Sequence, residues 1–480
     1  MIKLKKKFSI NVPILATVWY VGTNMLGKAF TFFSTPFFTR LLSPSQYGTY
    51  SLYVSWMSVF TVISTLEISG NISIRGFSGF KNEKSEFSSS ALGVQVTLTA
   101  FFLLIYMLFS GRINAITGLS TKLTVILLIQ VFLNSVIAIY FAEKRYSYKY
   151  KTVSYLNVLM GTLIPVCAIF IITLTRYKGY ARIISSLFIS GAVCIPIIIL
   201  TLRRCIKIYS RKMWKYIFGY AIPLLPHYLS LSIVAQGDKI LLSRIAGSYE
   251  LGKYTVAHSV GFTLSLVTGG LLSAATPWIH RKLESHENEK ITDAINICAK
   301  LLLLMVLIFL TVLPEIFRFI GGNQYYSAID AVYPIAISTV LIFLANVYTS
   351  IILHNGSPLS IAKNSITSAI IAVVGGYIII QRFGYLGAAY SSFIAYFALF
   401  ILNLVSANKI SSIKPLNFKS ISCGLVFAFT LQGILIFVRD ILLSRILVGL
   451  SLILMLIPML PRCLDLLKNN KNATRGSSHI

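Results

Sequence analysis

Charged residues are scarce in this chain. Only 12% of its 480 residues are Asp, Glu, Lys or Arg, and only 14 of them are acidic. A soluble protein keeps roughly 25% charged residues to cover its surface. The deficit excludes a molecule whose outside faces mostly water.

Signatures of catalysis and metal binding are missing as well. The six cysteines form no CxxC pair and fall mostly in apolar runs, where free cysteine behaves as a small hydrophobe, so we expect neither disulfides nor a metal site. There is no P-loop, Ser-His-Asp pattern, HExxH or paired-Asp sugar-nucleotide signature. No connection between apolar runs approaches the roughly 50 residues of a soluble domain. We predict that the chain is not an enzyme and uses no cofactor.

Long hydrophobic runs dominate what is present. Hydrophobic residues make up 56% of the chain, and the mean hydropathy is +0.78. Because a spanning helix needs roughly 20 apolar residues, the pattern predicts an all-α integral membrane protein with about 14 transmembrane helices. The expected spans are 14–38, 48–68, 90–110, 120–142, 152–174, 183–202, 217–240, 252–276, 297–320, 331–353, 363–380, 385–407, 420–438 and 441–460.

Basic residues set the expected orientation. The start MIKLKKK is like that of a signal peptide, but the apolar stretch 14–38 is too long for one and no small-residue cleavage site follows it, so we interpret it as a retained span. With the N-terminus in the cytoplasm, the cytoplasmic side holds more than twice as many Lys and Arg as the other side. This bias explains the net charge of +29 without nucleic acid. It predicts a multi-pass membrane protein with both termini in the cytoplasm.

An internal repeat divides the chain. Residues 39–55 (TRLLSPSQYGTYSLYVS) align without gaps with residues 243–259 (SRIAGSYELGKYTVAHS), which pairs Arg40 with Arg244 and Gly48 with Gly252. Six expected spans separate the copies, so both halves have the same orientation, as in transporters built from parallel repeats. A chance match of two similar helix edges is the alternative. We predict two pseudo-symmetric six-helix lobes plus two C-terminal helices.

The predicted parts follow from the spans and the repeat. They are an N-terminal six-helix lobe at 1–202, a basic cytoplasmic linker at 203–216, a C-terminal six-helix lobe at 217–407, two extra transmembrane helices at 408–460 and a cytoplasmic tail at 461–480.

Three segments carry a resemblance to a known superfamily. TRLLSPSQYGTYSL (39–52), DKILLSRIAGSYELGKYTVA (238–257) and GYLGAAYSSFIAY (384–396) are similar to signatures of the multidrug/oligosaccharidyl-lipid/polysaccharide exporters. The branch they resemble is that of the O-antigen and capsule repeat-unit flippases, and the likeness extends to about residue 460. It implies two lobes around a central cavity. It also implies a location in the bacterial inner (cytoplasmic) membrane. There the chain would carry undecaprenyl-diphosphate-linked oligosaccharide repeat units from the cytoplasmic to the outer leaflet by alternating access, as in lipopolysaccharide biosynthesis. The implied partners are that lipid-linked glycan, membrane lipids, a polysaccharide polymerase and a chain-length regulator, without nucleic acid.

A polar face runs along the first expected span. Its residues recur at spacings of one or two helical turns and are Thr17, Asn24, Lys28, Thr31 and Thr35. A charge near mid-bilayer costs on the order of 3 kcal/mol by insertion scales. We therefore predict that Lys28, with Asn24 and Thr31, lines a wet cavity and that its ammonium binds the substrate's diphosphate or acidic sugars. The alternative is that Lys28 snorkels toward the membrane surface or pairs structurally with Glu67.

Other polar residues are weaker candidates. His227 and His258 would line the cavity or simply pack, and Arg75 would attract the anionic carrier or only mark topology. Glu67 is a candidate for proton coupling or an ordinary solvated carboxylate. Asp238 and Lys239 are adjacent, so they point about 100° apart on a helix. Asp238 would close an outer gate with Arg40 or Arg244, or would belong to a structural ion network.

Two other functions compete with the flippase. A cation-coupled multidrug exporter of the same superfamily would need acidic cavity residues, whereas the mid-span charge here is Lys28. A membrane-embedded polysaccharide polymerase or ligase would need a large external loop, and the loops here are short. The identity of the sugar and the coupling ion does not follow from the sequence.

Overall fold

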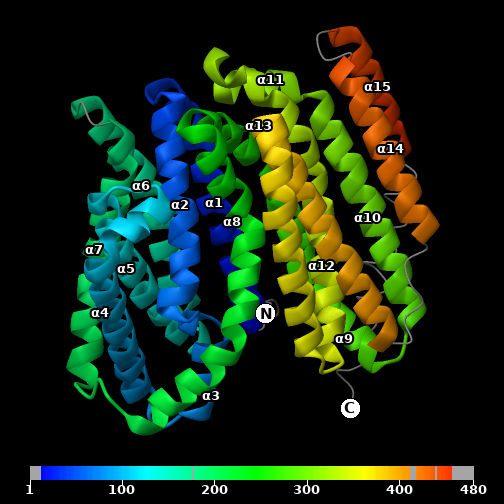
Figure 1. Cartoon of the computed structure of the whole chain (residues 1–480). Helices are drawn as coiled ribbons and strands as arrows, with labels where there is room; N and C mark the ends of the chain where they lie inside the picture. Colours follow the sequence, from blue (N-terminus) through cyan, green and yellow to red (C-terminus); the bar gives the residue numbers. More distant parts are fainter. Residues whose placement is uncertain (1–11, 176–177, 411–417, 438–440, 457–480) are drawn as a thin grey trace, which may run out of the picture. The chain divides into compact units, whose positions relative to one another are not determined.

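The structure, a computed structural model, describes residues 12–175, 178–410, 418–437 and 441–456, and all regular elements within these ranges are helices (Figure 1). The predicted all-α class is confirmed. The predicted tail at 461–480 lies outside the described residues.

The chain forms two compact units. Unit 1 comprises the residues up to Leu42 and Thr49–Ser232, and unit 2 comprises Ser43–Gly48 and the residues from Ile233 onward. The division falls inside a helix and not at the expected linker 203–216, and the predicted domain boundaries stay a prediction.

The helices before residue 211 are α1 (Val12–Leu41), α2 (Pro44–Thr65), the π-helix η1 (Ile68–Ile72), α3 (Ser73–Gly79), α4 (Lys84–Thr117), α5 (Thr121–Tyr146), α6 (Tyr150–Leu174) and α7 (Lys178–Arg204). Those that follow are α8 (Arg211–Phe262), α9 (Ser265–Glu284), α10 (Asn288–Thr311), α11 (Leu313–Gly321), the 3-10 helix η2 (Asn323–Ala331), α12 (Val332–His354), α13 (Pro358–Ile410), α14 (Phe418–Phe437) and α15 (Leu442–Leu456).

The protein is a multi-pass membrane protein. Large apolar side chains stand exposed along its helices, such as Phe188 at 76%, Met107 at 72% and Phe170 at 64%. Soluble monomers rarely expose large contiguous apolar patches. By length and composition, eight helices in the described part of the chain can cross a membrane, or nine if the bent pair α2 and η1–α3 forms one span.

Two of these helices are each long enough for two passes. α8 has 52 residues and α13 has 53, which at 1.5 Å per residue is more than twice the roughly 30 Å hydrocarbon core. α8 breaks at Gly247 (φ 83°) and α13 at Gly384 (φ 54°). A positive φ is readily adopted only by glycine, so each break falls where the chain can reverse. The breaks lie between expected spans 7 and 8 and between spans 11 and 12, while the total of 14 stays a prediction.

The first repeat turn has a specific helix start. The side chain of Ser43 accepts a hydrogen bond from the Gln46 N–H at 3.3 Å, and the Ser43 N–H donates to Gln46 Oε1 at 3.1 Å. This reciprocal arrangement is a capping box, and Pro44 follows at the first helical position, where its missing N–H costs nothing. The sequence SPSQ therefore fixes where α2 begins.

The second expected span, 48–68, does not run straight through. Leu66 and Glu67 have φ of 51° and 50°, a left-handed conformation that is strained for residues other than glycine, and they end α2 at Thr65. The side chain of the buried Gln95 in α4 donates to the Thr65 carbonyl at 3.1 Å. Because the break frees carbonyls that would otherwise bond within a helix, Gln95 stabilises it.

Unit 1 packs α4, α5 and α7 side by side (Figure 1). Phe77 and Phe87 are fully buried and meet edge to face with ring centroids 5.0 Å apart. The basic connection after α7 lies against α4, where Lys207 pairs with Glu86 at 2.7 Å. The segment predicted as a linker is thus bound to unit 1.

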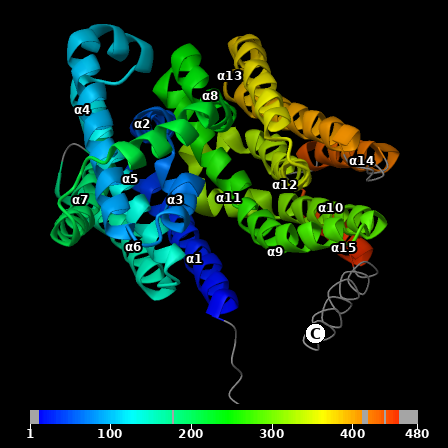
Figure 2. The same ribbon diagram turned by 90° about the horizontal axis from the view of Figure 1, so that it is seen from below.

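Unit 2 packs α12 along α13, and α15 along α10 (Figure 2). Asn364 and Asn403 join the two halves of α13 to α12: Asn364 donates to Asn403 Oδ1 at 2.9 Å, and Asn403 donates to Thr349 at 3.0 Å. Side-chain amides that bond across helices hold membrane bundles together where the hydrophobic effect cannot.

Candidate functional site

The best-defined polar centre of unit 2 surrounds Asp238, which is 5% exposed within α8. One carboxylate oxygen accepts the Lys239 N–H at 2.7 Å. The other accepts the Ser392 hydroxyl of α13 at 2.7 Å and the Tyr254 hydroxyl. A buried carboxylate is costly unless it is hydrogen-bonded, and here three donors from two helices satisfy it.

Two more predicted residues belong to this centre. Lys239 is 8% exposed and donates to Gln236 at 3.1 Å. His258 meets the Tyr254 ring edge-on at 5.9 Å and stacks on Phe262 at 5.1 Å. A carboxylate, an ammonium, an imidazole and a phenol thus gather in one buried cluster, a composition that can accept and release protons. Ionisable groups in membrane helices are functional candidates by default.

Arg40 and Arg244, the predicted gate partners of Asp238, are exposed residues. Closure of a gate by Asp238 with either arginine stays a prediction.

The polar face of the first span is described only in part. The side chains of Thr17, Asn24, Lys28 and Thr31 lie outside the described residues, although α1 itself is helical there. The neighbouring Gly27 packs on α6, where a Cβ added to Gly161 would lie 3.2 Å from the Gly27 Cα. The cavity role of Lys28, Asn24 and Thr31 stays a prediction.

The other candidates lie in unit 1. Glu67 is half-buried at the left-handed break after α2, Arg75 is exposed on α3, and His227 is half-buried in the first part of α8 beside Tyr228, with ring centroids 5.4 Å apart. Their roles stay predictions.

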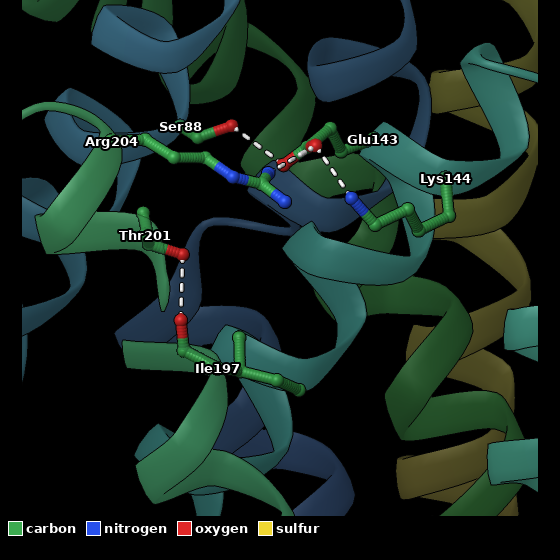
Figure 3. Close-up of polar contacts among 6 residues, drawn as sticks. All are labelled: Ser88, Glu143, Lys144, Ile197, Thr201 and Arg204. Atoms are coloured by element: carbon green, nitrogen blue, oxygen red, sulfur yellow. Dashed lines mark hydrogen bonds and ion pairs between the residues drawn. The ribbon is translucent and has the colours of Figure 1, made fainter. Parts of the chain in front are cut away.

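Sequence reasoning missed an ion cluster in unit 1 that Figure 3 shows. Glu143 at the end of α5 accepts hydrogen bonds from Lys144 at 2.8 Å, from Arg204 of α7 at 3.0 Å and from Ser88 of α4 at 3.1 Å. Lys144 is 5% exposed, and its ammonium lies 4.5 Å from the Tyr140 ring centre. A small cavity lined partly by Ser88 and Glu143 adjoins the cluster. The run EKR at 143–145 was the available signal, but by itself it indicates only topology.

A second missed pair joins α15 to α11 within unit 2. Arg445 in α15 is 6% exposed and makes a bidentate contact with Glu315 of α11 at 2.6 and 2.7 Å. It also donates to the Thr311 carbonyl at 3.1 Å. An arginine inside the apolar run 441–460 was the signal, because such a charge requires a partner.

The turn between α9 and α10 has its own ion cluster. Lys282 donates to Glu287 at 2.5 Å, and Lys290 and Ser285 also contact this carboxylate. The hydrogen bonds from Lys282 and Lys290 lower the pKa of Glu287 to about 2. This carboxylate therefore keeps its charge at neutral pH and neutralises part of the basic turn. Among the described residues, no group of three or more His, Cys, Asp or Glu is placed to hold a metal ion.

Comparison with known proteins gives a family and two relatives. The family model described as polysaccharide biosynthesis protein matches residues 16–283. The Lsg locus putative protein 1 of Haemophilus influenzae is 21% identical over 370 residues, which is 74% of this chain and 88% of the relative. An uncharacterized membrane protein of Methanocaldococcus jannaschii is 22% identical over 355 residues, 70% of this chain and 68% of the relative.

Solved membrane transporters share the fold. The lipid II flippase MurJ in an inward closed conformation has a TM-score of 0.66 at 14% identity, covering 94% of this chain and 100% of MurJ. An inward-facing multidrug resistance MATE transporter of the MOP superfamily has a TM-score of 0.63 at 16% identity, covering 83% of this chain and 95% of that one. A MOP superfamily transporter from Pyrococcus furiosus has a TM-score of 0.57 at 16% identity, covering 85% and 99%.

Proposed function

Because the chain belongs to the polysaccharide biosynthesis protein family, we propose that it is a flippase for undecaprenyl-diphosphate-linked oligosaccharide repeat units. It would carry them from the cytoplasmic to the outer leaflet of the inner membrane by alternating access. The family match carries this proposal, since it joins polysaccharide biosynthesis to a chain that crosses the bilayer many times. A structural relative named as a flippase for lipid II supports the same kind of cargo.

The fold alone does not select the cargo, because the same fold also serves multidrug transporters. The charges supply the further argument. The cargo's diphosphate is anionic, and the mid-span charge of the first span is Lys28. A lysine in a low-dielectric cavity would attract a diphosphate and repel a cationic drug.

The buried cluster of unit 2 has a place in this proposal. Asp238, Tyr254 and Ser392 connect α8 with α13 through one carboxylate. As a carboxylate, Asp238 accepts three hydrogen bonds. A protonated Asp238 would carry an O–H that needs an acceptor of its own, so the hydrogen bonds between α8 and α13 would have to rearrange. We assign to Asp238 the role of coupling transport to a proton, with Glu67 as the second carboxylate for that role.

Loss of the protein tests the flippase proposal. Cells that lack it should lose their surface polysaccharide and accumulate the lipid-linked repeat unit in the cytoplasmic leaflet, because synthesis continues while passage stops. Surface polysaccharide is assayed directly. The distribution of the lipid-linked glycan between the two leaflets is measured by its cleavage with a membrane-impermeant glycosidase added to either side of the membrane. Reintroducing the wild-type chain is the control. If cells without the protein kept their surface polysaccharide and became more sensitive to cationic drugs, a multidrug exporter would be favoured instead.

The proposed orientation places both termini in the cytoplasm. The surplus of Lys and Arg in alternate connections supports it. Reporter fusions at residues 5, 210 and 475 should all report a cytoplasmic location. A periplasmic signal at any of the three would contradict the orientation.

A further inference from the structure

The two repeat turns meet each other at glycine. The first turn of α2 crosses the turn of α8 that follows Gly247, and both segments belong to unit 2. A Cβ added to Gly48 would lie 1.8 Å from the Ser248 carbonyl oxygen, and a Cβ added to Gly252 would lie 1.8 Å from the Pro44 carbonyl oxygen. The backbones therefore approach so closely that no side chain fits between them.

The contact is reciprocal under the repeat. In the repeat alignment, Pro44 corresponds to Ser248 and Gly48 corresponds to Gly252. Gly48 approaches Ser248 and Gly252 approaches Pro44, so the same pair of repeat positions meets twice. In this way the contact resembles an isologous interface, in which the same patch is used twice across a two-fold axis. A chance resemblance of two helix edges does not explain such a contact. The two copies of the turn that align in the sequence therefore touch each other in the structure.

The chemistry of the crossing suits a contact that opens and closes. Its attraction comes from weak contacts between carbonyl oxygens and glycine Cα–H groups. The two helix starts both carry partial positive charge, so they repel weakly. The two segments meet backbone to backbone at the glycines. When they separate, no side chain is pulled out of a pocket at this point, so no cavity is left behind. Beside the crossing, the buried rings of Tyr47 and Tyr325 meet edge to face at 6.3 Å.

We propose that the Gly48–Gly252 crossing is a reversible closure at the non-cytoplasmic ends of α2 and of the second part of α8. It holds in the present state and separates in the state that releases cargo to the outer leaflet. This inference rests on the proposed flippase function and on the predicted orientation. It assigns to the two glycines a role in setting the balance between closed and open states.

An alanine at either glycine tests the proposal. Leu251, which is 0% exposed beside the crossing, is replaced by cysteine as a reporter. Spheroplasts are then treated from outside with an impermeant thiol reagent, and the same chain without the reporter serves as the blank. Adding Gly48→Ala or Gly252→Ala should raise the labelling of the reporter roughly tenfold, as a shift of about 1.4 kcal/mol toward the open state would give. Gly219→Ala is the matched control, because nothing lies within 4 Å of a Cβ there.

Several outcomes would overturn the closure. Unchanged labelling, with the variant present in the membrane at the wild-type level, would mean that the crossing is permanent packing. Labelling that rises only from the cytoplasmic side would place the crossing at the wrong end. Labelling could also increase in cells whose surface polysaccharide does not depend on this protein. That result would support the closure and reject the flippase function, so failure of the closure and failure of the function can be distinguished.

A cross-link covers the case in which the alanine variants fail to fold. Pro44→Cys with Ser248→Cys adds no bulk at the glycines, and a short bifunctional thiol reagent would join the two segments. Cross-linked protein should stop exporting polysaccharide, and a reducible linker should restore export on reduction. Full export by the cross-linked protein would show that the segments need not separate.

Discussion

Lys28→Ala should abolish surface polysaccharide while the protein stays in the membrane. The lysine belongs to a polar face of the first span, where an unpaired ammonium in lipid would cost on the order of 3 kcal/mol. In the proposed cavity its charge would offset the diphosphate during passage, where the low dielectric makes an unpaired phosphate expensive. Removing the ammonium raises that barrier. Surface polysaccharide and the amount of protein in the membrane are measured together.

The choice of substitution separates charge from shape. Lys28→Arg should retain part of the activity, because a mobile diphosphate needs a positive charge more than a fixed fork of donors. Lys122→Ala is the matched control, since this lysine is exposed at the start of α5. Full export by Lys28→Ala would reject the assignment. The cationic role would then pass to Arg40, Arg75, Lys239 or Arg244, of which Lys239 is buried and the three arginines are exposed.

Glu143→Gln should destabilise unit 1 by about 1–3 kcal/mol, the range for leaving a buried hydrogen-bonding group without its partner. The carboxylate neutralises Lys144, which is 5% exposed and donates to it at 2.8 Å. It also accepts from Arg204 and Ser88, so three helices lose a shared negatively charged acceptor. Glutamine leaves the ammonium buried without a counter-charge. The thermal unfolding midpoint of the purified protein in detergent measures the loss.

Two further variants show whether the effect comes from the uncompensated charge. Glu143→Gln with Lys144→Met removes both charges and should recover most of the stability, because an uncharged pair of similar shape replaces the ion pair and no uncompensated charge stays buried. Glu83→Gln is the matched control: its pair with Lys212 at 3.4 Å is exposed, and such pairs contribute at most about 1 kcal/mol. Equal losses for Glu143→Gln and Glu83→Gln would contradict the prediction.

Local signals in the sequence were enough to predict the class of protein, its helices and its repeat. An apolar run of about 20 residues has few alternatives to a spanning helix, because lipid cannot satisfy free backbone groups. The start of α2 was equally local, since Ser43 and Gln46 cap the helix within one turn. The repeat was visible because its two copies keep the same spacing, and that spacing reappears in the Gly48–Gly252 contact.

The polar centres were decided only by the tertiary structure, because their members come together through helix packing. Glu143 meets Arg204 from another helix, and Asp238 meets Ser392 across 154 positions of the chain. The break at Leu66 and Glu67 was hidden for a related reason: neither residue is glycine or proline, and packing holds both in a left-handed conformation. The sequence by itself therefore determined that the chain crosses the membrane many times and is built from a repeat. Which charges meet, and where the two copies of the repeat touch, depended on contacts between distant helices, which no local pattern encodes.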